Sequence, residues 1–507
     1  MQNERPQAIV NQYLSELRNP NTALTPKFAS HISHQATTLF FDHFHAHKKP
    51  LREAIELLCE INSLPDKKLA HYGVEALFPH LIEKLNDAFD PTFCELYDRL
   101  FAQVISYCRK LADGVLLDAT LNDFGLPNET SILSRKKAIT KSNYYLAPTR
   151  PLKKILFLSR VTLGADVAIT SVLMSRLKQL YPSAEIVIIG NSKLAQLYEG
   201  ESRIRINPID YGRNAKLLSR LLSWREVIAA VRQETADLSP QEYCLFDPDS
   251  RLTQLGLLPI LSPLLERQSY FYFASRSFTR PGCEKLGQLT SQWINDLTRN
   301  SDNTFPFISL SPKLNTIGSK LAGYLRSRCK QPLICLSFGV GGNEAKRVSE
   351  KFEMELVHKL SQHYLLFLDC GSTAKENDLA ERILGSLEAH GKTVLRLNEL
   401  TYSSNNFPHP QPAQLIAWKG GIGSFATLIA NSDRYIGYDS SGQHIAAALA
   451  IPTQTIFLNP NSLTFARRWQ PHGIAKTQVS LIDTSQKPSE ELITNRIFHD
   501  LSFLFET

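Results

Sequence analysis

The stretch DRYIGYDSSGQHIAAALAIPTQTIFL, residues 433–458, indicates the fold class of this chain. Arg434–Tyr438 is a short apolar run of the strand type, and the polar turn Asp439-Ser440-Ser441-Gly442 follows it. Gln443–Ala450 is rich in alanine and predicts a helix, which the next Ile-Pro pair ends. Thr453–Leu458 is rich in β-branched residues and predicts another strand. Strand, turn, helix and strand together form an α/β unit.

The polar turn in this stretch is a candidate phosphate site. A helix N-terminus leaves backbone N–H groups unpaired, and these donors act together with the positive end of the helix dipole. Ser440 and Ser441 add two hydroxyls, and His444 adds an imidazole one turn later. Ser and Gly are also ordinary residues at the start of a helix, and His444 can equally be a packed core histidine.

Length and charge limit the classes of function. The chain has 507 residues, enough for two to four domains, and its 43% hydrophobic content is that of a globular protein. The net charge of +7 is small for this length and forms no dense Lys/Arg block, so we expect no nucleic-acid partner. The excess suits an anionic substrate or weak contact with an anionic membrane face.

The same residues predict where the protein works. No apolar run approaches the roughly 20 residues that a membrane span needs. The first 20 residues have no apolar region of a secretory signal. We therefore expect a cytoplasmic protein, with peripheral contact with the inner membrane face as an alternative.

The sequence predicts no metal centre. Its eight cysteines form no C-x-x-C pair and are expected to be reduced structural thiols; they stand at 59, 94, 108, 244, 283, 329, 335 and 370. His43 and His47 share a helix face, which can bind zinc but is more often a polar face. Asp247-Pro248-Asp249 resembles the D-x-D of metal-dependent sugar transferases, although proline between two acids after a strand favours a turn.

Patterning divides the chain into four predicted segments. Residues 1–145 form a helical N-terminal domain, because apolar residues recur at spacings of three and four. Residues 151–315 and 330–485 alternate strand and helix patterns, as do doubly wound parallel sheets. Residues 486–507 form a C-terminal helix. The predicted N-terminal helices are Thr37–His47, Leu51–Ile61, Lys68–Phe89 and Pro91–Asp113, and Ser131–Pro151 is a polar, basic connector.

The two α/β segments each begin with a strand and a small-residue loop. The predicted strands of the first are 153–158, 185–190, 204–207, 243–246 and 270–274, and those of the second are 332–338, 364–369, 393–397, 434–438 and 453–458. Ligands of open parallel sheets bind beyond the carboxyl ends of the strands. We therefore expect the functional site in a cleft between two facing lobes.

Two further loops carry candidate residues. Asp166, in SRVTLGADVAITS, stands at a loop-to-helix boundary, where it either caps the helix or acts as a general base. In the second loop Gly341 and Gly342 permit a close approach of backbone to an anion, and Lys346 follows four residues later. This loop lacks the G-x-x-x-x-G-K-[ST] pattern and is not a P-loop.

Three stretches together resemble the ADP-heptose:lipopolysaccharide heptosyltransferases of glycosyltransferase family 9. ILFLSRVTLGADVAIT resembles the family's first strand with its Leu-Gly-Asp loop, and SFGVGGNEAKRVS resembles its second-half loop with a lysine at the nucleotide diphosphate. IANSDRYIGYDSSGQHIAAALAIPTQTIF resembles the Asp-Ser/Thr-Gly…His-x-x-Ala-Ala motif and is the most specific of the three. The resemblance covers about 151–485, and residues 1–145 lie outside it.

This resemblance implies an α/β protein of the GT-B architecture, with two Rossmann-like lobes facing a cleft and no essential metal or cofactor. Asp166 is then the base, and closure of the lobes brings it to the donor. The expected donor-binding residues are Gly341, Gly342, Lys346, Glu376 (a match to the ribose-binding glutamate), Asp439, Ser440, Ser441, Gly442 and His444. The chain departs from the family in three places: Ala165 lengthens the Gly-Asp pair, Arg347-Val348 replaces an aromatic-Pro pair after the lysine, and Ser441 takes the motif glycine's place.

The leading hypothesis is therefore an inverting, metal-independent glycosyltransferase that moves a sugar, with heptose one candidate, from a nucleotide diphosphate donor to a glycan or glycolipid acceptor such as lipopolysaccharide core. The alternative is a non-catalytic protein that binds nucleotide sugars and docks a partner through its N-terminal helices. A nucleotide-sugar epimerase has no specific support in the sequence.

Overall fold

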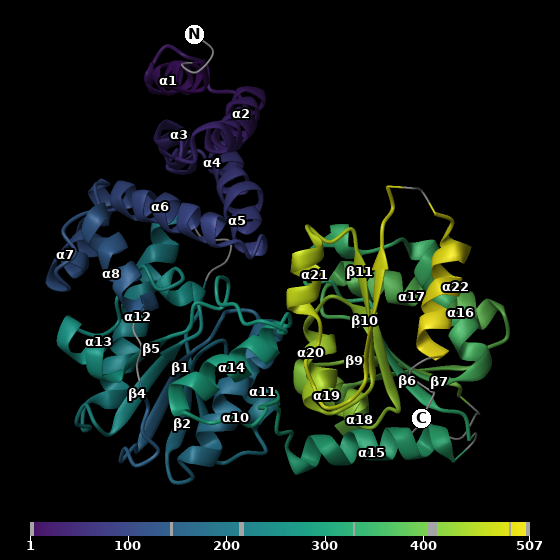
Figure 1. Cartoon of the computed structure of the whole chain (residues 1–507). Coiled ribbons are helices and arrows are strands. Elements are labelled where there is room, and N and C mark those ends of the chain that lie inside the picture. Colours follow the sequence, from purple (N-terminus) through teal and green to yellow (C-terminus); the bar gives the residue numbers. More distant parts are fainter. Residues whose placement is uncertain are drawn as a thin grey trace. The chain divides into compact units, whose positions relative to one another are not determined.

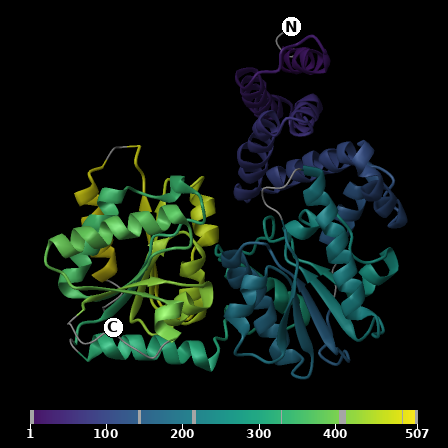
Figure 2. The ribbon, with the colours of Figure 1, turned by 180° about the vertical axis from the view of Figure 1, so that it is seen from behind.

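The computed structural model describes residues 5–141, 145–211, 217–327, 330–403, 413–485 and 488–502, with the side chains of 5, 402 and 403 excepted. Contacts within the chain define two compact units. The first unit holds residues 1–144, 150–161 and 207–278, and the second holds 145–149, 162–206 and 279–507. Figures 1 and 2 show the ribbon from opposite sides. Each unit is described by itself.

The N-terminal region is helical, as predicted. Its elements are α1 (Arg5–Arg18), α2 (Pro26–His47), α3 (Arg52–Asn62), α4 (Lys67–Glu75), the π-helix η1 (Ala76–Glu83), α5 (Lys84–Asp87), α6 (Pro91–Cys108), the 3-10 helix η2 (Ala112–Gly114), α7 (Val115–Asp123) and α8 (Glu129–Lys141). Polar caps begin the longer helices: Thr25 accepts a hydrogen bond from the amide of Phe28, and Asp90 accepts from those of Thr92 and Phe93.

The prediction of a connector over Ser131–Pro151 was wrong for its first part, which is the helix α8. The segment is polar and basic, yet α8 buries Ile132, Lys136 and Ile139. Lys136 donates to the carbonyl oxygen of Leu255 at 2.6 Å, so a lysine takes a core position that a hydrophobicity pattern assigns to solvent.

The first sheet has the parallel strand order β3-β2-β1-β4-β5. Its strands are β1 (Lys154–Leu158), β2 (Glu185–Gly190), β3 (Ile204–Pro208), β4 (Tyr243–Asp247) and β5 (Tyr270–Tyr272). The helices of this part of the chain are α9 (Leu163–Ala165), η3 (Asp166–Thr170), α10 (Ser171–Leu180), η4 (Ser192–Leu194), α11 (Ala195–Tyr198), α12 (Leu217–Thr235), η5 (Arg251–Thr253), α13 (Pro263–Ser269), α14 (Leu286–Thr298) and α15 (Pro312–Arg326).

The second sheet is parallel and has the order β12-β11-β10-β6-β7-β9-β8. Its strands are β6 (Leu333–Ser337), β7 (Leu365–Asp369), β8 (Val394–Asn398), β9 (Leu415–Lys419), β10 (Arg434–Tyr438), β11 (Thr453–Leu458) and β12 (Thr477–Ile482). Its helices are η6 (Glu344–Lys346), α16 (Glu350–His363), α17 (Ala374–Ala389), α18 (Glu399–Ser403), α19 (Ile422–Ala430), α20 (Ser441–Ala448), α21 (Leu463–Trp469) and α22 (Glu490–Ser502).

Helices cover both faces of the second sheet (Figures 1 and 2). On one face the buried core joins α16, α17 and α22 to the strands through side chains such as Phe352, Ile383 and Ile493. α22 is the predicted C-terminal helix; residues 486–487 and 503–507 of that segment lie outside the described residues. β9 and β12 were not predicted. β9 is a short apolar run that ends in Lys419, so the signal used for the other strands could have found it, whereas β12 mixes apolar and polar residues without a clear alternation.

The predicted fold class is confirmed: the chain is α/β, with two parallel sheets and an added helical N-terminal region. Among the described residues, no helix combines the length and apolar character required to cross a membrane. That the two sheets face a common cleft stays a prediction.

Candidate functional site

The second sheet has a topological switch point between β6 and β10. From β6 the chain extends the sheet through β7 to β9 and β8, and β10 then returns to the other side of β6 and leads on to β11 and β12. The loops that follow β6 and β10 therefore lie on the two sides of the switch point, at the carboxyl ends of the two strands. Ligands of open α/β sheets bind at such switch points.

Both loops carry residues that the sequence singled out. Lys346 follows β6 and Asp439 follows β10, and the Lys346 Nζ atom lies 2.7 Å from Oδ2 of Asp439 and 3.1 Å from its carbonyl oxygen. Gln443 donates to Oδ1 of Asp439 at 2.8 Å. Both carboxylate oxygens of Asp439 thus have partners, and the residue holds the ammonium group of Lys346 at the switch point.

The loop after β6 has the backbone that its glycines predict. Gly341 and Gly342 adopt φ values of 62° and 86°, a left-handed conformation that side chains disfavour. No atom lies within 4 Å of a Cβ built on either residue, so their backbone faces open space. Asn343 accepts a hydrogen bond from the amide of Ala345, which begins the turn that carries Lys346. The loop can present its amide groups to an anion beside the lysine.

The turn after β10 begins α20 with an uncapped end. Ser440 occupies the N-cap position, and its side chain makes no capping hydrogen bond. Ser440 and Ser441 are half-buried, and Gly442 is buried. The first amides of α20 and two hydroxyls are therefore oriented at the switch point beside Lys346, which is the chemistry expected for a phosphate site.

Gly442 has a steric role in addition. A Cβ atom on this residue would lie 2.0 Å from the hydroxyl oxygen of Tyr435, whose side chain is fully buried. We predict that Gly442→Ala lowers the free energy of unfolding by about 1–3 kcal/mol, because overpacking forces neighbours to move. Urea unfolding measures this loss. Adding Tyr435→Phe, which removes the hydroxyl oxygen, should recover part of it. An unfolding curve of Gly442→Ala equal to that of the parent would contradict the steric reading.

His444 lies inside the protein beside the site. Its side chain is 4% exposed and packs against Trp469 with the ring centroids 5.9 Å apart. Burial, together with the nearby charge of Lys346, lowers the pKa of His444 to about 3. The imidazole of His444 is therefore neutral at physiological pH. Among the predicted donor-binding residues, Lys346 is the one that carries a positive charge.

Asp166 lies in a segment that packs against α20, and its side chain is buried. A Cβ on Gly164, two residues earlier, would lie 3.2 Å from Cα of Ser441 and 3.4 Å from Cδ2 of His444. α9 and η3 belong to the second unit together with α20, so lobe closure is not needed to bring these segments together. Asp166 is 2% exposed and accepts a hydrogen bond from Thr170 at 2.9 Å. Thr162 holds the N-cap position, so the capping alternative for Asp166 was wrong.

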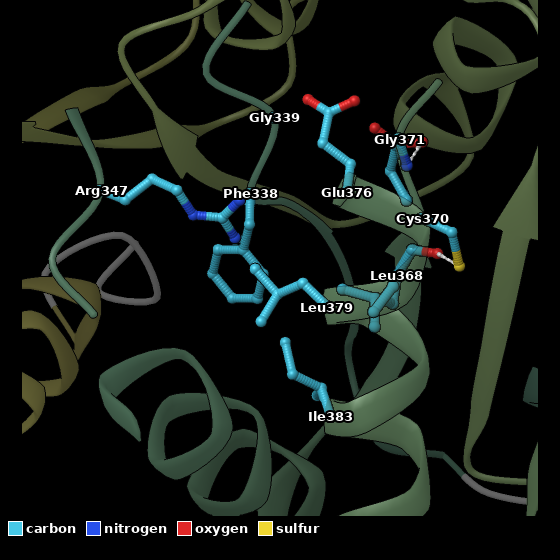
Figure 3. A pocket seen from close by; sticks show the side chains of 11 residues that line it. Phe338, Gly339, Arg347, Leu368, Cys370, Gly371, Glu376, Leu379 and Ile383 are labelled. Carbon is cyan, nitrogen blue, oxygen red and sulfur yellow. Dashed lines mark hydrogen bonds between the residues drawn. The ribbon is translucent and has the colours of Figure 1, made fainter. Parts of the chain in front are cut away.

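A pocket opens on the other side of β6, at the carboxyl ends of β6 and β7 (Figure 3). Its apolar part is formed by Phe338, Leu379 and Ile383, and Arg347 reaches it from the loop after β6. The remaining lining residues are Gly339, Leu368, Asp369, Cys370, Gly371, Glu376 and Ala380. The pocket and the Lys346–Asp439 contact thus flank the same loop.

Two carboxylates form the polar part of this pocket. Glu376 closes a capping box at the start of α17, where its Oε2 atom accepts from the amides of Ser372 and Thr373. Asp369 accepts from the Ser337 hydroxyl at 3.0 Å, and burial raises its pKa to about 6. Glu376 therefore lines a pocket and also caps a helix, which the sequence interpretation did not foresee; its contact with a ribose stays a prediction.

The sequence did not single out several residues of this region as candidates for the site. Gln443 stands inside the quoted motif, Arg347 and Glu353 stand in and after the glycine loop, and Asp369 ends a predicted strand. An acid at the carboxyl end of a strand next to the switch point could have indicated Asp369. Nothing in the sequence indicates the pairing of Arg347 with Glu353, because it depends on how α16 packs.

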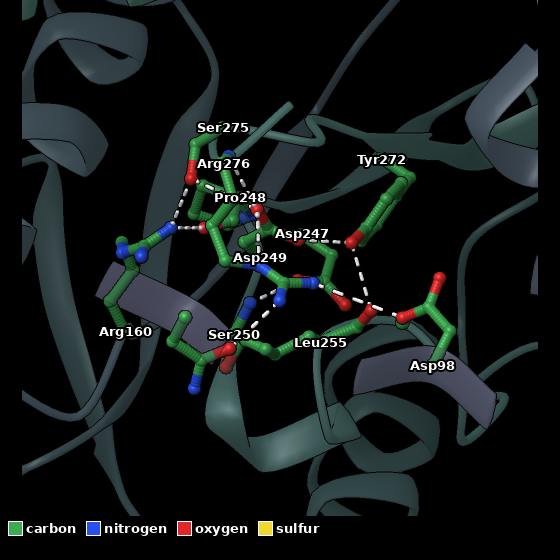
Figure 4. A network of polar contacts seen from close by, with 12 residues as sticks. Asp98, Arg160, Asp247, Pro248, Asp249, Ser250, Leu255, Tyr272, Ser275 and Arg276 are labelled. Carbon is green, nitrogen blue, oxygen red and sulfur yellow. Dashed lines mark hydrogen bonds and ion pairs between the residues drawn. The ribbon is translucent and has the colours of Figure 1, made fainter. Parts of the chain in front are cut away.

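The first sheet has its own switch point, between β1 and β4, and side chains fill it (Figure 4). Asp249 accepts hydrogen bonds from Tyr272 and Ser275 and from the amide of Arg276. Burial alone would raise the pKa of Asp249, but Arg276, Lys136 and Arg160 outweigh it and hold the pKa at about 2. The turn predicted at 247–249 thus belongs to a buried ionic cluster around Asp249.

The N-terminal region contributes to this cluster. Arg276 donates to Asn86 at 2.8 Å and lies 3.9 Å from Asp98 of α6. Lys136 of α8 contacts Tyr272. The histidine pair of α2, His43 and His47, lies elsewhere with ring centroids 4.5 Å apart. Within the described ranges no group of three or more His, Cys, Asp or Glu side chains has the arrangement of a metal site.

The chain matches no known family model and no curated protein sequence. Its fold is similar to that of a glycosyl transferase family 9 protein from Veillonella parvula DSM 2008, with 14% identity over 72% of this chain and 99% of that chain and a TM-score of 0.48. The E. coli ADP-heptose lps heptosyltransferase II gives 16% identity over 69% and 98% of the two chains, with a TM-score of 0.44. E. coli heptosyltransferase WaaC with ADP gives 14% identity over 68% of this chain and 99% of that chain, with a TM-score of 0.44. Similarity at this level assigns no chemistry, which must come from the residues themselves.

Proposed function

We propose that this chain is a glycosyltransferase that moves a sugar from a nucleotide diphosphate donor to the hydroxyl group of a glycan or glycolipid acceptor. The observation that carries the proposal is the meeting of Lys346 and Asp439 at the β6/β10 switch point. A cation, two serines and the first amides of a helix lie there, beside a pocket that is lined by apolar side chains and by the carboxylates Asp369 and Glu376.

The diphosphate and the nucleoside of the donor each match one part of this site. Its diphosphate pairs with Lys346, Ser440 and Ser441 and with the amides of the glycine loop. Its nucleoside enters the pocket, where the flat base meets Phe338 and the ribose hydroxyls meet the carboxylates. Breaking the sugar C–O bond leaves growing negative charge on the diphosphate, and donors that are fixed in advance stabilise that charge most in the transition state.

The acceptor needs a base, and we assign that role to Asp166. Its carboxylate takes the proton of the acceptor hydroxyl while the oxygen attacks the anomeric carbon, and the electron pair of the breaking bond leaves with the nucleoside diphosphate. This single displacement inverts the anomeric configuration and uses only residues of the chain. Because Asp166 is 2% exposed, the acceptor reaches it only after neighbouring segments of the second unit open.

The lysine provides the first test. We predict that Lys346→Met reduces turnover by about 10²–10³-fold and weakens binding of nucleoside diphosphates, because it removes the cation that we place at the leaving group. Nucleoside diphosphate release, measured with a panel of donors and acceptor extracts, reports turnover, and calorimetry reports binding. Lys351→Met is the matched control, since Lys351 is 77% exposed on α16.

The outcomes separate this function from the alternative. Equal turnover of Lys346→Met and the parent would refute the assigned role of the lysine. Tight binding of nucleotide sugars without transfer to any acceptor would favour the non-catalytic binding protein instead.

A further inference from the structure

Tyr435 of β10 lies beneath the first turn of α20, and its hydroxyl group lies at the carboxyl end of that strand. A Cβ atom on Gly442 of α20 would lie 2.0 Å from the hydroxyl oxygen, and one on Gly437 of β10 would lie 2.3 Å from it. Glycine at both positions lets the hydroxyl contact the backbone directly. The ring of Tyr435 thus lies in the core, and its polar end reaches the inner side of the candidate phosphate site at Ser440 and Ser441.

The hydroxyl of Tyr435 is buried without a partner. The side chain is fully buried, and its oxygen makes no hydrogen bond with any of the residues that the structure describes. Buried tyrosine hydroxyls usually have a partner, because an unpaired buried donor destabilises the folded state. Phenylalanine would fill the same space without that penalty. The folded protein alone therefore gives this hydroxyl no role, and a ligand at the adjoining site could complete its hydrogen bonding.

Two side-chain hydroxyls lie near that of Tyr435, those of Ser440 and Ser337. Burial raises the pKa of the Tyr435 phenol, and both serine hydroxyls oppose this rise. Ser337 already donates its proton to Asp369 at 3.0 Å. Ser440 occupies the N-cap position of α20 and makes no capping hydrogen bond. A serine hydroxyl has one proton and two lone pairs, so Ser440 can donate to a ligand while it accepts from Tyr435.

We infer that Tyr435 is a positioning residue of the phosphate site, where its hydroxyl donates to Oγ of Ser440 and Ser440 donates its own proton to a phosphate oxygen of the ligand. The inference rests on the proposed function and adds to it a residue that the ligand does not touch. Hydrogen bonds in such a chain polarise one another, and the negative charge at its end strengthens them. Tyr435 therefore contributes to the affinity for phosphate and not to the stability of the free protein.

Tyr435→Phe tests this division between affinity and stability. We expect the affinity of the full-length protein for inorganic pyrophosphate, and for whichever of ADP, UDP and GDP binds most tightly, to fall about 3–10-fold, as for the loss of one hydrogen bond. Calorimetry measures this affinity. The midpoint of urea unfolding of the free protein should equal that of the parent or rise, because no hydrogen bond of the free protein is lost.

Tyr438→Phe is the matched comparison for stability. Tyr438 is also a fully buried tyrosine of β10, but its hydroxyl donates to Glu353 at 3.0 Å and accepts from the amide of Val348 at 3.1 Å. Its replacement leaves buried polar groups without a partner, so the midpoint of urea unfolding should fall. The two variants remove the same atom from the same strand, and they differ in whether that atom has a partner in the free protein.

A double-mutant cycle tests whether Tyr435 acts through Ser440. Ser440→Ala should weaken binding of the same ligands, and adding Tyr435→Phe to it should cause no further loss, because the chain of donors is already broken. Ser440→Thr keeps the hydroxyl group, so Tyr435→Phe should still weaken binding in that background. A merely structural role of Tyr435 would give the same loss in all three backgrounds.

The outcomes separate this inference from the proposed function. The inference is overturned, and the proposed function stands, if Tyr435→Phe or Ser440→Ala binds as the parent does, or if their effects are independent. A fall in the urea midpoint of Tyr435→Phe as large as that of Tyr438→Phe also overturns it. So does a Tyr435→Phe variant that does not fold, because the hydroxyl would then stabilise the free protein. Failure of pyrophosphate and of all three nucleotides to bind the parent overturns both.

Discussion

Asp166→Asn should lower turnover by about 10²–10⁴-fold while the affinity for nucleoside diphosphates stays within about twofold of the parent. The substitution keeps the size of the side chain and its hydrogen bond from Thr170, and it removes the basic carboxylate. Because the diphosphate is expected at Lys346 and α20, loss of the base should change the chemical step alone. Product release under saturating donor and acceptor measures turnover, and calorimetry measures affinity.

A matched exposed acid provides the control for this experiment. Asp302 is 78% exposed, so Asp302→Asn should leave turnover unchanged. If Asp166→Asn turns over at the parent rate, the base lies elsewhere and the assignment of Asp166 fails. If it loses nucleotide binding as well, the residue holds α9 and η3 against α20, and its role is structural.

Arg276→Met should lower the free energy of unfolding by about 3–5 kcal/mol, because it leaves Asp249 charged and buried without its main counter-ion. Arg276 is 5% exposed and Asp249 is 1% exposed, and the arginine also packs over Tyr97 with its Cζ atom 4.7 Å from the ring centroid. Urea unfolding followed by circular dichroism measures the loss. The double variant Arg276→Met/Asp249→Asn should recover part of it, because no unpaired charge remains.

Arg99 offers the comparison on the same helix as Asp98. It pairs with Glu95 at 2.6 Å and is 43% exposed, so Arg99→Met should cost less than about 1 kcal/mol. A loss of that small size for Arg276→Met would mean that water or movement of the chain compensates the buried acid. It would then follow that the ionic cluster does not hold the N-terminal helices to the first sheet.

Local patterns predicted much of the fold. Arg434–Tyr438, Glu185–Gly190 and Thr453–Leu458 form strands with the predicted bounds. They were predictable because buried strands of a parallel sheet are short runs of β-branched and aromatic residues between turn signals. α8 and β12 were not predicted, because each depends on a partner far away in the chain. Lys136 of α8 donates to the carbonyl oxygen of Leu255, and β12 pairs with β11.

The residues of the candidate site were predictable from the sequence, but the contacts between them were not. Gly341 and Gly342 were predictable, because their left-handed backbone suits glycine whatever surrounds it. Lys346 and Asp439 were predictable as separate candidates, and their 2.7 Å contact was not, because 93 residues separate them in the chain.

The amino-acid sequence by itself determined the α/β class, the helical N-terminal region and the turn chemistry around Ser440, since each follows from side-chain periodicity or from the few residues that a turn accepts. Only the tertiary structure decided that β6 and β10 lie side by side, that Arg347 is locked by Glu353, and that the Asp247-Pro248-Asp249 turn is closed by Arg276. Those outcomes depend on strand order and helix packing, which bring together charges far apart in the chain, and no local pattern specifies such pairs.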